Sequence, residues 1–127
     1  MEYLIDTNVA LWCLAAPDRL SKKARKLLET PSSLIHFSSI SIVEFDLKRE
    51  RLLSAYAHLA DEFAPQLTAL GFSALAFVAA DASGLAAIRP NRDPFDRMLA
   101  TQAIRRNLTL VTADQDLLDY RPLRTLW

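Results

Sequence analysis

Short apolar segments alternate along this chain with segments of helical periodicity. The short segments have the length of buried strands, and the apolar residues between them recur three and four positions apart, as in amphipathic helices. Strands separated by helices are joined by right-handed crossovers, so they lie parallel and the helices cover both faces of the sheet. The alternation therefore predicts a three-layer α/β domain built on five parallel strands. The strand candidates are the segments 3–5, 34–37, 72–78, 108–112 and 123–126.

Prolines and capping residues divide the intervening segments into helices. Ser21 has the side chain of an N-cap, and Pro17 and Pro31 follow segments that must end there. Pro65 is expected to break or kink the helical stretch that Ser54 opens. The expected helices are 7–15, 22–29, 42–51, the stretch from 54 to 71, 82–88, 94–106 and a last turn at 115–119.

Length and composition limit the domain count and the chemistry. A chain of 127 residues with 51% hydrophobic residues makes a single globular domain spanning 1–127. Two glycines cannot build a dinucleotide-binding fingerprint or a P-loop. Cys13 is the only cysteine, and His36 and His58 are far apart in the sequence, which excludes a disulfide framework and a thiolate or paired-imidazole zinc site. We interpret Cys13 as core filler and both histidines as structural or surface residues.

Charge and hydropathy bear on the partners. Fifteen basic residues balance fifteen acidic ones, so a nucleic acid would have to be held by local basic spots. The longest apolar run, 74–80, is far too short to span a bilayer, and no cationic segment precedes an apolar one at the N-terminus. We therefore expect a cytoplasmic protein with no membrane partner.

Acidic residues follow the predicted strands. In an open parallel sheet, ligands bind beyond the carboxyl ends of the strands, so these residues belong to one rim. Four separate segments bring carboxylates to that rim. The acidic residues are Asp6 after the first strand, Glu44 after the second, Asp93 and Asp96 before the fourth, and Asp114 after it.

Helix capping is the simplest alternative for each acid taken singly. Asp6, Asp93 and Asp114 stand where N-caps stand, and Ser41 begins an S-x-x-E capping-box pattern that ends at Glu44. A non-catalytic binding module whose acids only cap helices is thus one interpretation. However, two carboxylates about 4 Å apart repel by roughly 4 kcal/mol at an effective dielectric near 20, whereas an acid at a helix start contributes about 0.3–1 kcal/mol. A group of four needs a cation or protons.

An oxygen-only ligand set selects a hard divalent ion, Mg²⁺ or Mn²⁺, which shares its coordination with water and substrate phosphate. Such a site is suited to metal-assisted hydrolysis of a phosphodiester. A phosphatase with an aspartyl nucleophile is a rival, but it requires a second aspartate where this chain has Asn8.

These motifs also carry a family resemblance. Asp6-Thr7-Asn8, Glu44 in its S-x-x-E stretch, Asp93-Pro94-Phe95-Asp96-Arg97 and Leu110-Val111-Thr112-Ala113-Asp114 together resemble a PIN domain, most closely the VapC-type toxins, and the match runs from Tyr3 to Trp127. The resemblance implies strand order 3-2-1-4-5 and a Mg²⁺-dependent endoribonuclease that leaves 5′-phosphate ends and is inhibited by a cognate antitoxin. A PIN-like nuclease of RNA processing, outside any toxin system, is the alternative.

The resemblance also assigns roles to residues. It implies Asp6, Glu44, Asp96 and Asp114 as the catalytic, metal-binding acids, with Asp6 and Asp96 as principal ligands and the other two holding a second ion or orienting its waters. Asp93 is expected to be a helix cap or an outer residue of the site, Asn8 and Thr112 to hydrogen-bond within it, and Arg97 to be the best candidate for an RNA phosphate contact.

Further surfaces are expected for RNA and for protein partners. The wide apolar stretch of Leu11, Trp12, Leu14 and Ala15 near Leu27-Leu28 suggests a seat for an antitoxin segment or for the second subunit of a homodimer. The other basic spots are Lys48, Arg49 and Arg51, then Arg89 and Arg92, then Arg105 and Arg106.

Overall fold

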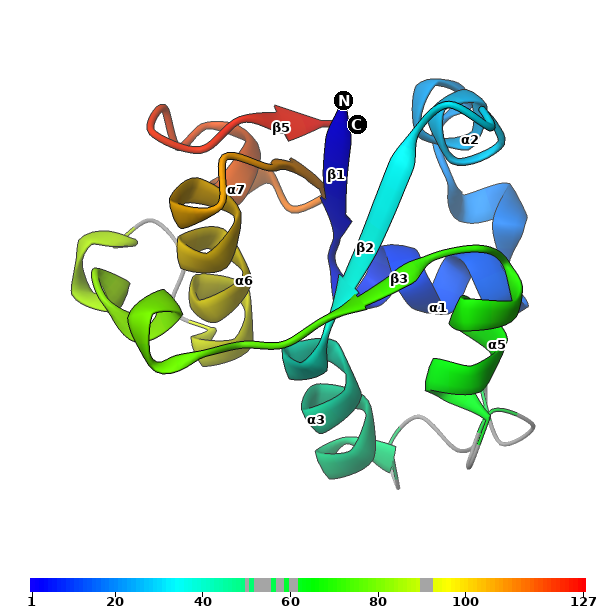
Figure 1. The fold of residues 1–127 in the computed structure, drawn as a ribbon, viewed down its shortest axis with the longest axis horizontal. Coiled ribbons are helices and arrows are strands. Elements are labelled where there is room, and N and C mark those ends of the chain that lie inside the picture. The colour runs from blue at the N-terminus through cyan, green and yellow to red at the C-terminus, as the bar shows by residue number, and fades with distance from the viewer. Residues whose placement is uncertain (50, 52–55, 57–58, 60–61, 90–92) are drawn as a thin grey trace.

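A parallel sheet of five strands forms the centre of the protein (Figure 1). The structure is a computed structural model that describes residues 1–49, 51, 56, 59, 62–89 and 93–127. The strand order is β3-β2-β1-β4-β5 and every neighbouring pair is parallel, which confirms the expected α/β fold and its order 3-2-1-4-5. The strands are β1 (Glu2–Ile5), β2 (Leu34–Ser38), β3 (Ser73–Leu75), β4 (Thr109–Val111) and β5 (Thr125–Leu126).

Helices cover both faces of the sheet (Figure 1). Along the central strand β1, Tyr3 and Ile5 enter one core together with residues of α1, α2 and α5, whereas Leu4 enters a second core together with residues of α6 and α7. This alternation is the period of two that a strand imposes on its side chains. The helices are α1 (Thr7–Ala15), α2 (Lys22–Leu28), α3 (Ser39–Leu47), α5 (Phe63–Ala69), α6 (Pro94–Arg105) and α7 (Gln115–Leu118), with short 3₁₀ turns η1 (Pro17–Arg19), η3 (Ala79–Ala82) and η4 (Leu85–Ala87).

Helix α3 begins three residues earlier than the sequence predicts. Ser38, the last residue of β2, is its N-cap, and the Ser38 hydroxyl accepts a hydrogen bond from the backbone N–H of Ile40 at 3.0 Å. The expected capping box from Ser41 to Glu44 is therefore wrong, because both residues lie inside the helix. The strand passes into the helix without a loop, so the apolar run of the strand and that of the helix merge in the sequence.

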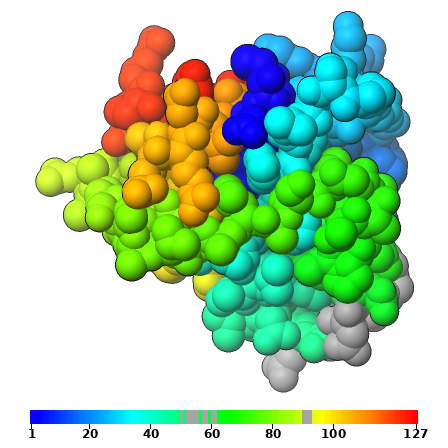
Figure 2. All heavy atoms as spheres, viewed as in Figure 1, coloured from blue at the N-terminus to red at the C-terminus, as the bar shows by residue number. Residues whose placement is uncertain are grey.

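Strand β3 is much shorter than the expected segment 72–78. Beyond it, the backbone N–H of Phe77 donates to the hydroxyl of Ser39 and that of Val78 donates to the carboxylate of Asp81. These side chains satisfy backbone groups that would otherwise extend the ladder. In the space-filling view, the segment from α5 to η4 then runs as a continuous green band above α3 (Figure 2).

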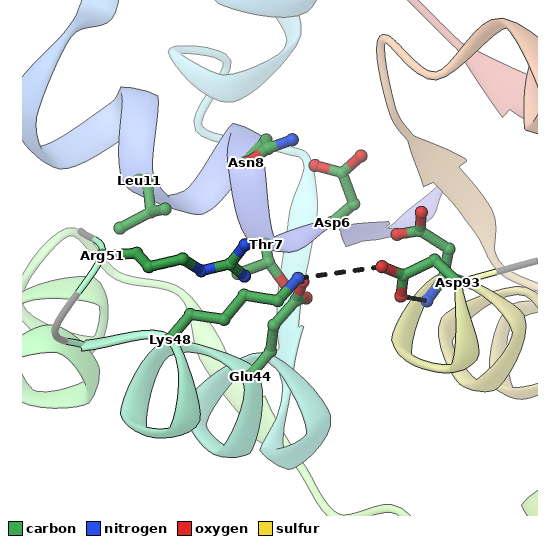
Figure 3. A pocket seen from close by; sticks show the side chains of 9 residues that line it. Asp6, Thr7, Asn8, Leu11, Glu44, Lys48, Arg51 and Asp93 are labelled. Atoms are coloured by element: carbon green, nitrogen blue, oxygen red, sulfur yellow. Dashed lines mark hydrogen bonds and ion pairs between the residues drawn. The ribbon is translucent and has the colours of Figure 1, made fainter.

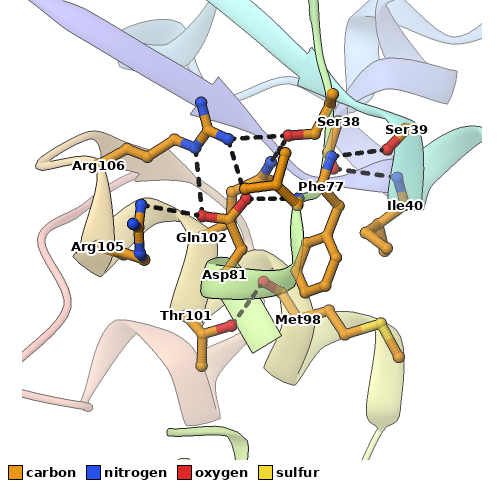
Figure 4. A network of polar contacts seen from close by, with 12 residues as sticks. Ser38, Ser39, Ile40, Phe77, Asp81, Met98, Thr101, Gln102, Arg105 and Arg106 are labelled. Atoms are coloured by element: carbon orange, nitrogen blue, oxygen red, sulfur yellow. Dashed lines mark hydrogen bonds and ion pairs between the residues drawn. The ribbon is translucent and has the colours of Figure 1, made fainter. Parts of the chain in front are cut away.

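A buried carboxylate holds that segment against α6 (Figure 4). Asp81 is fully buried, and Arg106 donates to both of its oxygens, at 3.3 and 3.0 Å. Arg106 and Gln102 also donate to the backbone carbonyl of Ala76, at 3.0 and 3.2 Å. Burial raises the pKa of Asp81, but the hydrogen bonds from Arg106 and Val78 and the charge of Arg106 outweigh it, so the pKa lies below its ordinary value.

Two other expected elements also differ. The helix predicted over 82–88 is a pair of 3₁₀ turns on either side of Gly84, whose φ of 88° interrupts a helix. Pro65 does not break a helix: it is the third residue of α5, where its missing N–H has no partner within the helix. The beginning of the stretch predicted from Ser54 lies outside the described residues, as does His58. None of the helices in the described part of the chain combines the length and the apolar character of a membrane span.

The apolar stretch in α1 is largely packed against the core. Leu11 is buried, and Trp12, Leu14, Ala15, Leu27 and Leu28 are partly buried against the core on that face. The ring of Trp12 also contacts that of Trp127, with ring centroids 5.6 Å apart. Cys13 packs in the same layer, and burial together with the charge of Asp6 raises the pKa of its thiol to about 11, which suits a filling role.

Candidate active site

A pocket of about 350 Å³ opens at the carboxyl ends of the central strands (Figure 3). It lies where α1 leaves β1, where α3 passes alongside and where α6 begins. Four of the five acidic residues that the sequence placed at this rim line it. The lining residues are Asp6, Thr7, Asn8, Leu11, Glu44, Lys48, Arg51, Asp93 and Asp96.

Asp6 stands between β1 and α1 and is only 5% exposed. Its backbone N–H donates to the carbonyl of Val111 in β4 at 3.1 Å, and its carboxylate caps α1 by accepting from the N–H of Val9 at 2.8 Å. Burial is the main cause that raises the pKa of Asp6 to about 6, and the negative charges of Glu44 and Asp114 raise it further. The hydrogen bonds from Thr112 and Val9 act in the opposite direction and lower the pKa. Asp6 therefore caps a helix, as the simpler interpretation requires, in surroundings that disfavour its charge.

Glu44 projects from the middle of α3 and is 8% exposed. Its Oε2 accepts a hydrogen bond from the ammonium of Lys48, while its Oε1 is buried without a hydrogen-bond partner among the described residues. A buried carboxylate oxygen without a partner is costly. Because Glu44 lies outside the first turn of α3, capping does not explain its position.

Asp93 and Asp96 bring the start of α6 to the pocket. Asp93 is the N-cap of α6, and its Oδ1 accepts from the N–H groups of Phe95 and Asp96 at 2.8 and 3.2 Å. Its Oδ2 lies 3.7 Å from the ammonium of Lys48. Asp96, in the first turn of the helix, lines the same pocket.

Asp114 is the N-cap of α7, where it accepts from the N–H of Asp116 at 2.9 Å. It is not part of the pocket lining, but its charge acts on Asp6. Thr112 connects the two acids: this buried residue hydrogen-bonds the carboxylate of Asp6 through its side chain and accepts from the N–H of Asp114 at 3.0 Å.

Two cationic side chains lie in the pocket that the sequence did not assign to the acidic site. Lys48 and Arg51, which the sequence leads one to expect in a basic spot for RNA, both line the pocket itself. The i,i+4 spacing of Glu44 and Lys48 was the available signal, since such residues are neighbours on a helix. By contrast, Arg97 lies one residue after Asp96 on α6 but does not line the pocket, and Arg92 lies outside the described residues.

The donor set fits a hard divalent cation. Among the described residues, no three carboxylate, imidazole or thiolate side chains lie close enough together to coordinate one metal ion directly. However, the buried Oε1 of Glu44 lacks a partner, and Asp6 is held where its charge is disfavoured. Mg²⁺ keeps several of its waters and needs only one or two carboxylates, so an open pocket lined with acids suits it.

Comparison with solved structures shows that the fold is shared by proteins of low sequence identity. A chain of DNA-bound VapBC from Salmonella typhimurium is similar with a TM-score of 0.71 and 19% identity, over 99% of this chain and 97% of that one. A chain of VapBC2 from Rickettsia felis, bound to a promoter DNA fragment, has a TM-score of 0.70 and 18% identity, over 99% of this chain and 98% of that one. A chain of FitAcB from Neisseria gonorrhoeae has a TM-score of 0.64 and 23% identity, over 99% of this chain and 96% of that one.

Curated protein sequences gave no match to this chain. The family model of the PIN domain, in contrast, matches residues 3–121, which include every acid of the candidate site. PIN domains are nucleases that generally use a divalent metal ion. Since the model spans nearly the whole chain, the protein belongs to the PIN domain family.

Proposed function

We propose that this protein is a Mg²⁺-dependent endoribonuclease and the toxin of a VapBC-type toxin-antitoxin pair. The observation that supports catalysis best is the pair of buried acids in one pocket. Asp6 has a pKa raised to about 6, and Glu44 has a buried oxygen without a partner among the described residues. A divalent cation in the pocket would stabilise the charged form of Asp6 and would give the buried oxygen of Glu44 a partner. RNA as the substrate follows from the resemblance to VapC-type toxins, and it would place the protein in the cytoplasm.

In the proposed site Asp6 and Asp96 are the principal metal ligands, and Glu44 and Asp114 bind the ion or orient its waters. A Mg²⁺ or Mn²⁺ ion held by these acids would supply the polarisation of the scissile phosphate and the lowered pKa of the attacking water that metal-assisted hydrolysis needs. Oε1 of Glu44 has no hydrogen-bond partner among the described residues, so we expect it to face the ion or one of the waters bound to the ion. Either Glu44 or Asp114 would accept the proton of the attacking water. Thr112 would orient Asp6 through its side-chain hydrogen bond, and we expect the exposed side chain of Asn8, which lines the pocket, to hydrogen-bond RNA.

The proposal is tested with purified protein and total RNA. With Mg²⁺ or Mn²⁺ we expect cleavage that leaves 5′-phosphate ends, which sequencing of the new ends would locate, and no cleavage in EDTA. Asp6→Asn and Asp96→Asn should abolish cleavage. Asp18→Asn, in the exposed turn η1 outside the pocket lining, is the matched control and should retain it. Retained cleavage in Asp6→Asn, or no metal requirement, would contradict the proposal.

The toxin assignment is supported by the structural neighbours, which are chains of toxin-antitoxin complexes or of the VapBC and FitAB type. We expect a cognate antitoxin, and a homodimer as the working form. Expression alone should arrest growth, and co-expression of the neighbouring small reading frame should restore it. Normal growth with active, folded protein would favour the alternative, a PIN nuclease of RNA processing. Light scattering would give the oligomeric state.

A further inference from the structure

Lys48 spans the pocket between two acids that lie on different helices (Figure 3). It donates to Oε2 of Glu44, one turn earlier on α3, and its Nζ lies 3.7 Å from Oδ2 of Asp93 at the start of α6. The same ammonium lies 5.2 Å from the centroid of the Phe95 ring. Three groups from two helices therefore hold this one positive charge in place.

This arrangement differs from an ordinary surface ion pair. Surface pairs at i,i+4 contribute little because water screens them and because two mobile side chains must be ordered. Here the Glu44 side chain is only 10% exposed, so its carboxylate is largely withdrawn from water, and the Lys48 side chain is partly buried at 26% exposed. The ring of Phe95 adds a favourable face for a cation. Lys48 is thus a fixed cation within the acidic pocket.

The charges of the pocket lining suggest what this cation does. Four carboxylates and two cationic side chains line the pocket, which leaves two negative charges for a bound ion to neutralise. One divalent ion supplies that charge. A second divalent ion beside Glu44 and Asp93 would lie against the ammonium of Lys48, which already takes one oxygen of each acid.

We propose that the ammonium of Lys48 takes the place of a second metal ion, so that the site binds a single divalent ion. Oε1 of Glu44 would face that ion or one of its waters, in the pocket that Asp6 and Asp96 also line, while Oε2 stays with Lys48. Lys48 acts here as a positioning residue: it fixes the carboxylate of Glu44 and sets the metal stoichiometry. This inference rests on the proposed metal-dependent function.

The test counts bound Mn²⁺ by electron paramagnetic resonance and by calorimetry, so it does not depend on activity. We expect the wild-type protein to bind one ion per chain and Lys48→Met to bind two. Lys48→Arg, which keeps the charge, and the control Lys23→Met, at an exposed site of α2, should both bind one. Should Lys48→Met fail to fold, Lys48→Gln replaces it with the same expected gain, because its amide can hydrogen-bond Glu44 without a charge.

The outcomes separate the two proposals. Two ions on the wild-type protein, or one ion on the charge-removing variant, would overturn the role of Lys48 and leave the nuclease proposal standing. If the wild-type protein binds no Mn²⁺, the metal-dependent function itself is wrong and the role of Lys48 is wrong with it.

Discussion

The hydroxyl of Thr7 donates a hydrogen bond to the hydroxyl of Ser41 at 2.9 Å, in a buried position between α1 and α3. Thr7 immediately follows Asp6, and Ser41 lies one turn before Glu44 on α3. This single contact therefore connects the backbone segments that carry the two most buried acids of the pocket.

Thr7→Val removes the donor of this contact and keeps the size of the side chain. It leaves the hydroxyl of Ser41 without that partner in a buried place, which should lower the free energy of unfolding by about 1–2 kcal/mol. We also expect a lower cleavage rate, because this hydrogen bond no longer fixes the distance between Asp6 and Glu44. Urea denaturation and initial cleavage rates measure both effects. Thr7→Ser, which retains the hydroxyl, should behave like the wild-type protein. If both variants lose the same amount of stability and of cleavage rate, the hydrogen bond is not the cause.

The raised pKa of Asp6 predicts a pH-dependent stability of the metal-free protein. The folded state holds a proton on Asp6 up to a pH of about 6, whereas the unfolded chain releases it near 3.8. The folded state thus binds more protons between these values, so stability falls as the pH rises through this window. At neutral pH the free energy of unfolding is lower by about 3 kcal/mol, which follows from the difference between the two pKa values of Asp6.

Asp6→Asn should remove this loss while keeping the helix cap, since asparagine is also a good N-cap residue. In EDTA the variant should be more stable than the wild-type protein at pH 7.5 and nearly equal to it near pH 4. Urea denaturation between these pH values measures the difference. In saturating Mg²⁺ the order should reverse, because an ion bound only by the folded wild-type protein stabilises it. A variant less stable than the wild-type protein at every pH in EDTA would show that Asp6 serves the fold alone.

The position of Arg51 in the pocket lining predicts a larger role in RNA binding than that of Arg97. Arg51→Ala should weaken binding of a non-cleavable RNA and reduce the slope of log affinity against log salt by about 1, as expected for one lost phosphate contact. Arg97→Ala tests the sequence-based choice in the same titration. An unchanged slope for Arg51→Ala, with a reduced slope for Arg97→Ala, would restore Arg97 as the phosphate contact.

The sequence predicted the fold and the rim of acids because both depend on local pattern and on general rules of parallel sheets. The acids after β1 and at the start of α6 line one pocket, as this reasoning leads one to expect, since the carboxyl ends of parallel strands meet at one edge, whereas Asp114 after β4 does not line it. The role of Lys48 could not be predicted in this way. Its partner Asp93 is distant in the sequence, and only the packing of α3 against α6 brings the two side chains together.

The errors in element boundaries have a related cause. The start of α3 is set by the hydroxyl of Ser38, which accepts from the backbone N–H two residues later. The end of β3 is set by the carboxylate of Asp81, which accepts from the N–H of Val78, and by the hydroxyl of Ser39, which accepts from the N–H of the distant Phe77. Periodicity of apolar residues carries no information on such contacts. The capping-box pattern at Ser41 misled for the same reason, because a better cap lies three residues earlier.

The ion pair of Asp81 with Arg106 predicts a stability effect that is separate from catalysis (Figure 4). Asp81→Asn removes the buried negative charge that pairs with the partly exposed guanidinium groups of Arg106 and Arg105, so we expect the free energy of unfolding to fall by about 1–3 kcal/mol at neutral pH. Because the folded-state pKa of Asp81 lies below its ordinary value, the pair contributes its stability above that value and loses it as the pH falls through the lowered pKa. The difference between variant and wild type should therefore shrink in acid, which urea denaturation from pH 7 down to pH 3 would reveal.

Asp119→Asn is the control for this prediction. The carboxylate of Asp119 is exposed and accepts a hydrogen bond from the side chain of Gln115, so its replacement should change stability little at any pH. Cleavage by the folded fraction of Asp81→Asn should stay near the wild-type rate, since this carboxylate lies outside the pocket lining; a large loss of cleavage at full folding would instead show that the segment after β3 positions α6 for catalysis.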